Sequence, residues 1–207
     1  MKIVIPAREG SKGFPHKNRK LLAHTLKIIP KHMLENTYVS TDDEHIKSKL
    51  PPQVKIHHRS EKVSNDTAST LSTMQEFVKD CNIEGDVVML YLTYPERKWE
   101  HVAAAYEQLK STGSSSLLCK KELDVHPYLM MYDAGQNKGK QIVEHNLYRR
   151  QDYPACFEIS HYVSIFNTKE LNKLNNNMYN ENTYFFEIDN VTDVDYEEDL
   201  KKVSLWL

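Results

Sequence analysis

Three cationic side chains lie in a short loop near the start of the chain, at spacings that suit the binding of phosphate groups. The opening stretch, MKIVIPAREGSKGFPHKN, places Arg8, Lys12 and Lys17 directly after an apolar, β-branched run. Gly10 and Gly13 allow the backbone to approach an anion closely, and the cations would neutralise a polyphosphate. The loop is neither a Walker A loop nor a GxGxxG dinucleotide fingerprint. These residues leave two interpretations open, a polyphosphate-binding loop and a solvated basic surface loop.

Two aspartates near the other end of the chain form a candidate metal site. In VTDVDYEEDL, Asp193 and Asp195 supply carboxylate oxygens, which are the hard ligands that Mg²⁺ prefers. Alternate residues of an extended segment point to opposite faces, so a bend must bring both carboxylates to one ion. The competing interpretation is a helix capping box, with Asp195 as the N-cap and Glu198 three residues later.

Strands that alternate with helices are expected to position these residues. The alternation predicts an α/β fold with a mostly parallel sheet flanked by helices. Ligands bind outside the carboxyl ends of such strands, which is where the opening loop lies. The expected strands are Lys2–Ala7, Thr37–Thr41, Val54–His58, Asp86–Leu92 and Ser114–Cys119, and the expected helices lie at about 24–34, 43–49, 66–80 and 99–111.

The pattern changes after about residue 122. Leu123–Val143 contains HPYLMMY and the turn DAGQNKGK, which predict a hairpin that projects from the main sheet. Tyr162–Asn167 and Tyr184–Ile188 are expected to return as strands, and Asp195–Trp206 as a terminal helix. We therefore expect one domain over residues 1–207, with a projecting arm at about 122–160.

Composition argues against several function classes. The 207 residues carry 27 Lys and Arg against 29 Asp and Glu, a net charge of −2, which argues against nucleic acid as a partner. No apolar run approaches the roughly 18–20 residues of a membrane span. An N-terminus that enters a strand at once argues against a signal peptide. Cys81, Cys119 and Cys156 lack CxxC spacing and are expected to be reduced thiols of a cytoplasmic protein.

Four stretches, in order along nearly the whole chain, resemble the acylneuraminate cytidylyltransferases, the CMP-sialic acid synthetase family. PAREGSKGFPHKN is similar to the family's opening PARxGSKxxPxKN, and VSTDDEHI to its second strand and turn. RSEKVSNDTAST resembles its nucleotide-binding segment, and VTDVDYEEDL its C-terminal DxDxxxDL. The resemblance implies a Rossmann-like nucleotidyltransferase fold with a protruding dimerisation arm. It also implies transfer of CMP from CTP to the anomeric hydroxyl of a nonulosonic (sialic-acid-like) sugar, with release of pyrophosphate and a need for Mg²⁺ or Mn²⁺.

The resemblance assigns roles to individual residues. Asp193 and Asp195 match the family's metal-binding pair. Asp66 matches a nucleotide-binding position, and a competing interpretation makes it only the cap of a helix that begins at Thr67. Catalytic roles at the triphosphate are implied for Arg8, Lys12 and Lys17, and nucleotide contacts for Arg8, Ser11, Lys12, Asn18, Arg59, Asp66, Ala68 and Thr70.

The acceptor half departs from the family pattern. Tyr91 stands where the family has a Gln near the sugar, Leu129 where it has a Lys, and Glu158 where it has an Arg. We predict that Tyr91 and Glu158 contact a changed acceptor, although both positions are also compatible with drift away from substrate. Tyr at the first position is closer to the pseudaminic acid cytidylyltransferase branch. About six residues that relatives place between Asn18 and the first helix are missing. The general base cannot be assigned from the residues.

Two alternatives stand beside a sialic-acid-type enzyme. In the first, the same CTP chemistry serves a pseudaminic, Kdo-like or non-sugar acceptor; in the second, the protein is a catalytically degenerate nucleotide-binding paralogue. The intact cations and aspartates argue against degeneration. The resemblance further implies a homodimer, because the family's arm reaches the partner's sugar site. The apolar YLMMY of this arm fits burial by a partner and burial within the chain equally well.

Overall fold

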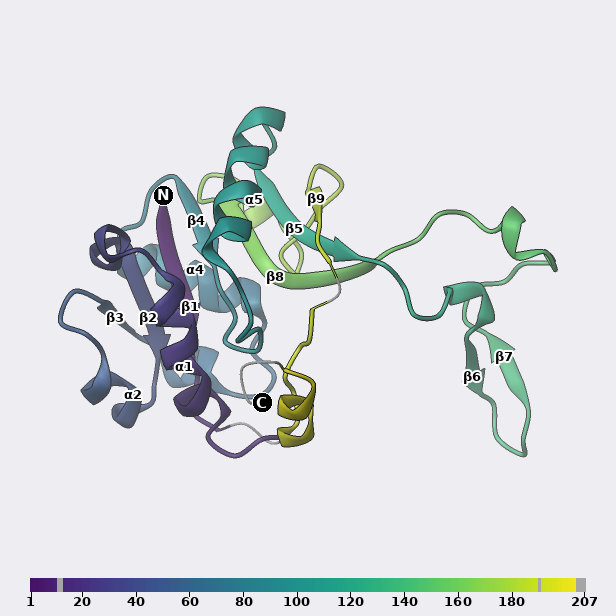
Figure 1. Ribbon diagram of the computed structural model, residues 1–207, viewed down its shortest axis with the longest axis horizontal. Helices are drawn as coiled ribbons and strands as arrows, with labels where there is room; N and C mark the ends of the chain where they lie inside the picture. Colours follow the sequence, from purple (N-terminus) through teal and green to yellow (C-terminus); the bar gives the residue numbers. More distant parts are fainter. Residues whose placement is uncertain (11–12, 190, 204–207) are drawn as a thin grey trace.

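A seven-stranded sheet forms the centre of the computed structural model, which describes residues 1–10, 13–189 and 191–203 (Figure 1). The sheet has the order β3-β2-β1-β4-β8-β5-β9, and only β8 runs antiparallel to both of its neighbours. The predicted, mostly parallel α/β sheet is therefore confirmed. The strands are β1 (Lys2–Pro6), β2 (Thr37–Thr41), β3 (Lys55–His58), β4 (Asp86–Met89), β5 (Ser116–Lys121), β8 (Glu158–Asn167) and β9 (Tyr184–Glu187).

Helices cover both faces of this sheet. The longer helices α1 (Lys17–Ile28) and α4 (Thr70–Asp80) lie on opposite sides, and α5 (Trp99–Thr112) covers the region of β5, β8 and β9 (Figure 1). Short helices are α2 (Glu44–Lys49) and α3 (Glu61–Ser64), with 3₁₀ helices η1 (Lys31–Asn36), η2 (Pro127–Leu129), η3 (Arg150–Asp152), η4 (Leu171–Lys173) and η5 (Glu197–Lys202).

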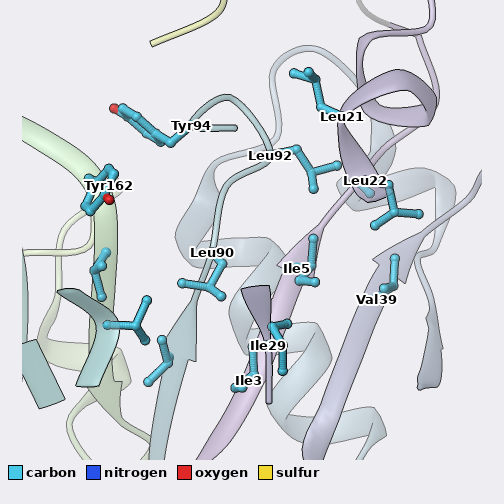
Figure 2. Close-up of a cluster of buried hydrophobic side chains, with 14 of the residues drawn as sticks. Ile3, Ile5, Leu21, Leu22, Ile29, Val39, Leu90, Leu92, Tyr94 and Tyr162 are labelled. Carbon is cyan, nitrogen blue, oxygen red and sulfur yellow. The ribbon is translucent and has the colours of Figure 1, made fainter. Parts of the chain in front are cut away.

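Alternate residues of the central strands pack against different helices, because successive side chains of a strand point to opposite faces. Ile5 of β1 and Leu22 of α1 belong to one buried cluster, whose side chains Figure 2 shows between helix and sheet. Val4 belongs to a second cluster together with Phe77 of α4. Burial on both faces explains why the parallel strands read as continuous apolar runs.

The start of the first helix differs from the prediction. We expected a helix at about 24–34, whereas α1 begins at Lys17, inside the KN pair of the opening motif. Phe14 is fully buried just before the helix, and its carbonyl accepts a hydrogen bond from the Lys17 backbone at 3.1 Å. This anchor places the polar first turn of α1 beside the loop, a consequence of tertiary packing that the local pattern did not reveal.

The predicted hairpin is present and projects from the main sheet. Strands β6 (Met131–Asp133) and β7 (Gly139–Gln141) pair in an antiparallel two-stranded sheet at the far end of the arm (Figure 1). Gly135, Gln136 and Asn137 have positive φ values of 79°, 54° and 59°, which close the turn. The strand β8 returns from this arm, and its antiparallel direction follows from that path.

The C-terminal segment also differs in part from the prediction. In place of a helix over Asp195–Trp206, the structure forms the short 3₁₀ helix η5, and residues 204–207 lie outside the described residues. All three cysteines have free thiols, as expected. Among the described helices, none combines the length and apolarity needed to cross a lipid bilayer.

Candidate active site

A cavity of about 320 Å³ lies at the carboxyl ends of β1 and β4. The chain passes from β1 to β2 and β3 on one side and then crosses to β4 on the other, so these two strands form a topological switch point. Ser11 and Lys12 lie outside the described residues. Of the residues predicted to bind substrate or act in catalysis, the lining contains Arg8, Lys17, Asn18, Arg59, Asp66, Ala68, Thr70 and Tyr91.

Contacts with Asn18 and Asp66 hold Arg8, near the start of the opening loop, at the wall of this cavity. The Asn18 side-chain amide donates to the Arg8 carbonyl oxygen at 2.8 Å, so the first turn of α1 fixes the loop. Arg8 Nη1 lies 2.8 Å from Asp66 Oδ1, with about a third of the Arg8 side chain exposed. The opening loop therefore directly contacts the segment of residues 66–69 (the DTAS segment), although the two residues of this ion pair, Arg8 and Asp66, are far apart in the sequence.

Gly13 brings the opening loop against the C-terminal segment. A Cβ atom at Gly13 would lie 2.9 Å from the Asp195 carbonyl oxygen and 3.1 Å from the Tyr196 ring. The sequence suggested that this glycine serves close approach to an anion. In the structure its small size serves the approach of two protein segments, which places the motif carrying Asp195 beside the motif carrying Lys17.

Arg59 is a largely buried cation at the cavity wall. Its guanidinium donates to the carbonyl oxygen of Val63 and, at 3.1 Å, to Thr73 Oγ1. Burial lowers the pKa of Arg59 from its ordinary value, partly offset by the charge of Asp42. The Nε atom makes no hydrogen bond within the described part of the chain. A buried donor of this kind is available to an acceptor group in the cavity.

The capping interpretation of Asp66 is wrong. Helix α4 begins at Thr70 rather than Thr67, and its N-cap is Ser69, whose hydroxyl accepts from the Ser72 backbone at 3.1 Å. Because serine supplies the cap, the Asp66 carboxylate is directed instead to Arg8 at the cavity.

The two C-terminal aspartates lie on either side of buried Val194, whose N–H donates to the Thr93 carbonyl at 2.8 Å. This bond attaches the segment to the end of the β4 region. Asp193 Oδ2 accepts from the Tyr94 hydroxyl at 2.9 Å, and Asp195 Oδ1 lies 2.9 Å from Lys17 Nζ. Both carboxylates therefore contact residues at the carboxyl edge of the sheet.

The predicted capping box is shifted by one residue. The N-cap of η5 is Tyr196 rather than Asp195, and the residue three positions later is Asp199 rather than Glu198. Asp199 Oδ2 accepts from the backbone N–H groups of Asp195 and Tyr196 at 3.1 and 2.9 Å. Because Tyr196 occupies the N-cap position, the Asp195 side chain is not used as a cap and contacts Lys17 instead.

Tyr91 lines the cavity between Thr70 at the start of α4 and His161 of β8. Its hydroxyl is 2.6 Å from Thr70 Oγ1, and burial raises its pKa. The ring packs edge-on against His161, with 5.3 Å between ring centroids. Burial lowers the pKa of His161, opposed by the charge of Asp193. The sequence analysis missed His161; the only signal available was its position in FEISH, the stretch aligned with the family's sugar-contact motif.

Arg97 supports this wall from behind and was also missed. It is 2% exposed and donates to the carbonyl oxygens of Tyr162 at 2.6 Å and Tyr91 at 2.7 Å. Its guanidinium lies over the rings of Tyr94 and Tyr162, at 5.6 and 5.4 Å from their centroids. Burial lowers the pKa of Arg97 to about 10. Its two bonds fix β8 relative to the Tyr91 backbone.

Glu158 lies elsewhere, at the base of the arm. It begins β8 and pairs with Lys121 of β5 at 3.0 Å, and it does not line the cavity. Leu129 is in η2 of the arm and is 43% exposed. Within this chain, therefore, only Tyr91 of the three departures from the family pattern lines the cavity at the carboxyl ends of β1 and β4.

Comparison with known proteins places the chain. A family model described as cytidylyltransferase matches residues 2–206. The chain belongs to this cytidylyltransferase family. The resemblance seen in the four motifs is thereby confirmed, and the chain is a nucleotidyltransferase-family protein.

Relatives of this cytidylyltransferase-family chain differ in length and in the function that their names give. An N-acylneuraminate cytidylyltransferase of Streptococcus agalactiae is 28% identical over 196 residues, covering 89% of this chain and 47% of the relative. The chain thus spans about half the length of that relative. A post-translational flagellin modification protein B of Campylobacter coli is 27% identical and is matched over 92% of its length.

Solved structures show the same fold. The structure of CMP:2-keto-3-deoxy-manno-octonic acid synthetase complexed with CTP has a TM-score of 0.67 at 15% identity, covering 98% of this chain and 95% of that one. A 4-diphosphocytidyl-2C-methyl-D-erythritol synthase from Anaerococcus prevotii has a TM-score of 0.66 at 12% identity, covering 99% of this chain and 96% of that one. At these identities the likeness concerns architecture, and it agrees with the predicted nucleotidyltransferase fold.

Proposed function

We propose that the protein transfers CMP from CTP to the anomeric hydroxyl of a nonulosonic sugar acid and releases pyrophosphate. The observation that carries this proposal is that the opening loop, Arg59 and the segment of residues 66–70 converge on one cavity. The segment of residues 193–195 lies against the opening loop at Gly13. Segments from distant parts of the sequence, from Arg8 to Asp195, thus meet at one topological switch point of the sheet. Such a switch point is the usual position of a ligand in an open α/β sheet.

The cationic side of the cavity would hold the triphosphate. The acceptor oxygen attacks the α-phosphorus of CTP, and the bond from that phosphorus to the pyrophosphate oxygen breaks. Catalysis of such a transfer consists mainly of positioning and charge neutralisation. Arg8 and Lys17 lie where they can bind the departing pyrophosphate, and we assign Ser11 and Lys12 of the same loop to the same task.

The opposite wall would hold the nucleoside. Arg59, Ala68 and Thr70 line this part of the cavity, and Asp66 and Asn18 hold the Arg8 loop against it. The unused Nε donor of Arg59 supports an interaction with a base or ribose oxygen there.

Asp193 and Asp195 would bind Mg²⁺ or Mn²⁺. The residues fit such an ion by their chemistry, because two carboxylates with substrate phosphates and water are a usual Mg²⁺ ligand set. Each carboxylate also has a neighbour, Tyr94 or Lys17, that orients one of its oxygens. The bound ion would neutralise phosphate charge during the transfer.

Tyr91 supports assignment of the acceptor to the region beside it and His161. We propose a sialic-acid-like acceptor, and the same cavity suits a pseudaminic or Kdo-like acid or another alcohol. Glu158 reaches a sugar only if it acts outside this chain's own cavity, at the site of a second copy. A catalytically degenerate protein is less well supported, because Arg8, Lys17 and both C-terminal aspartates are present.

The arm supports a homodimer in which each copy contributes to the other's acceptor site. Its apolar side chains are exposed, among them Leu129 at 43%, Met131 at 54% and Tyr132 at 58%. Several exposed apolar side chains on one short arm favour a protein partner. Free thiols support a reducing, cytoplasmic location, and the net charge of −2 gives no support for nucleic acid as a partner.

The proposal is tested by pyrophosphate release from CTP and Mg²⁺ with N-acetylneuraminic, legionaminic, pseudaminic and Kdo acids. We expect pyrophosphate release with one acid, and loss of this release in Lys17→Met. The control variant Lys169→Met changes an exposed lysine far along the chain and should keep the activity. Binding of CTP without release for any acid would overturn the acceptor class. Failure to bind CTP at all would overturn the proposed function.

A further inference from the structure

A second group of ligand-type side chains lies outside the nucleotide cavity, between β3 and α4. His57 is at the end of β3, and Glu76 and Asp80 are four residues apart on α4, on one face of the helix. The Nε2 atom of His57 lies 4.0 Å from Glu76 Oε1 and 3.8 Å from Asp80 Oδ2. One potential ligand atom from each residue lies within 4.8 Å of the others.

The His57 ring is buried and one of its nitrogens lacks a hydrogen bond. Only 2% of the residue is exposed, and Nε2 has no hydrogen-bond partner among the described residues. This nitrogen is directed at the two carboxylates, at distances too long for a hydrogen bond. A buried polar atom without a partner requires an explanation.

Contacts around the group hold two of the ligands in place. Nδ1 of His57 lies 2.9 Å from the Ser40 hydroxyl, which fixes the ring. Glu76 accepts from the backbone N–H of Ser60 at 3.0 Å and from its hydroxyl at 2.5 Å. Metal-binding histidines and carboxylates are commonly oriented by such outer hydrogen bonds.

A divalent cation satisfies all three groups better than a proton does. Burial lowers the pKa of His57, against the influence of Glu76 and Asp80, which favours the neutral ring that metals require. With Nε2 unprotonated, its lone pair faces two negative carboxylates, and a cation between them removes this repulsion. An imidazole nitrogen and carboxylate oxygens are ligand types that Zn²⁺ accepts, and three protein ligands leave a fourth position for water.

We propose that His57, Glu76 and Asp80 bind a divalent metal ion of the Zn²⁺ type and join β3 to α4. Ligand atoms about 2.0–2.1 Å from tetrahedral Zn²⁺ are roughly 3.3 Å apart. The two distances from Nε2, 4.0 and 3.8 Å, must therefore contract by less than about 1 Å each, and the separation of the two carboxylate oxygens, which is within 4.8 Å, by at most about 1.5 Å. The Asp80 side chain is 50% exposed and can make this movement. The tie joins the strand that leads into Arg59 to the helix that begins at Thr70, so it supports the nucleotide cavity from outside.

The test is Zn²⁺ titration of the full chain, stripped of metal by chelation, with calorimetry and with Co²⁺ absorption as a spectroscopic probe. We expect one equivalent to bind at this group and to raise the melting temperature. Asp80→Asn should weaken it by at least about 10–100-fold, as loss of metal-site partners does. This variant changes a half-exposed carboxylate at the end of α4, so the fold is retained.

Two controls separate this site from other ligands. Glu84→Gln alters an exposed carboxylate just beyond α4, and Asp195→Asn alters the proposed catalytic metal site; both should leave the β3–α4 binding event unchanged. The Co²⁺ spectrum should lack a thiolate charge-transfer band, because Cys81 is outside the ligand group. Equal Zn²⁺ affinity in the wild type and Asp80→Asn, absence of binding in the wild type, or a thiolate band would each overturn the proposal.

Discussion

The contact between the opening loop and the C-terminal segment gives the most direct prediction. Gly13→Ala would place a methyl group 2.9 Å from the Asp195 carbonyl oxygen and 3.1 Å from the Tyr196 ring. Gly13 has no left-handed φ, so the effect is steric alone. Neither neighbour is the far end of a flexible chain, because one is backbone and the other a ring near its attachment. The two segments must separate by several tenths of an ångström.

The expected magnitude follows from that displacement. Overpacking of a buried core costs about 1–3 kcal/mol of unfolding free energy, and because Gly13 and Asp195 are exposed we expect a cost near the lower value, about 1 kcal/mol. The movement also separates Asp195 from Lys17, which are 2.9 Å apart. Because misplacement by about 1 Å can cost about 10²-fold in rate, we expect Gly13→Ala to lower pyrophosphate release by about 10–100-fold.

A matched glycine separates stability from activity. Gly113 follows α5 at the amino end of β5, remote from the cavity at the carboxyl ends, and a Cβ there meets open space. Its φ of +67° makes Gly113→Ala cost about 1–2 kcal/mol through backbone strain. Urea unfolding and steady-state kinetics should show similar losses of stability but a loss of activity only in Gly13→Ala. Equal activity in the two variants would refute the reasoning that the loop contact positions the site.

Three further predictions concern the cavity and the loop. Lys17→Met should lower kcat for pyrophosphate release by about 10²–10³-fold, as loss of one charge-stabilising donor does, and a loss below tenfold in steady-state kinetics would contradict its role. Tyr91→Phe removes the 2.6 Å contact between the Tyr91 hydroxyl and Thr70. It should lower the free energy of unfolding in urea by about 0.5–1.5 kcal/mol and leave the affinity for CTP unchanged. A large loss of CTP affinity would instead show that Tyr91 contacts the nucleotide. Buried Asp43 caps α2 and accepts from Arg19 at 2.6 Å; burial would raise its pKa, but these hydrogen bonds lower it below its usual range. The charged Asp43 carboxylate therefore stabilises the fold at pH values above its pKa in the unfolded chain, about 3.9. This stabilisation is lost as the pH falls through the lower pKa that Asp43 has in the folded protein. Asp43→Asn should lower the unfolding free energy by about 1–3 kcal/mol at neutral pH and progressively less in acid, and a pH-independent difference would contradict the sign.

The grouping of the candidate site residues could be anticipated from the sequence. The position of the opening loop at the carboxyl end of the first strand followed from the strand and helix pattern, and the resemblance to the family joined Arg59 and Asp66 to it. The structure brings Arg8, Lys17, Arg59 and Asp66 to one cavity.

Local patterns failed where a non-local partner decides. Asp66 had the composition of a cap, but Ser69 takes that position and leaves Asp66 to Arg8. Asp195 likewise had the spacing of an N-cap with Glu198 as its partner, but Tyr196 takes the N-cap position, Asp199 takes the place of Glu198, and the Asp195 side chain contacts Lys17. A short polar side chain can satisfy either a helix end or a distant partner, and only the fold determines which one is within reach.

The sequence by itself determined the alternation of strands and helices, the arm with its hairpin, the family and most of the described residues that were predicted for the site and that line one cavity. Only the tertiary structure decided the antiparallel direction of β8, the start of α1 at Lys17 and the placement of Tyr91 beside His161. It also placed Glu158 at the base of the arm. Periodicity reports which face of a segment is buried, whereas the pairing of strands far apart in sequence is set by closure of the whole sheet and core.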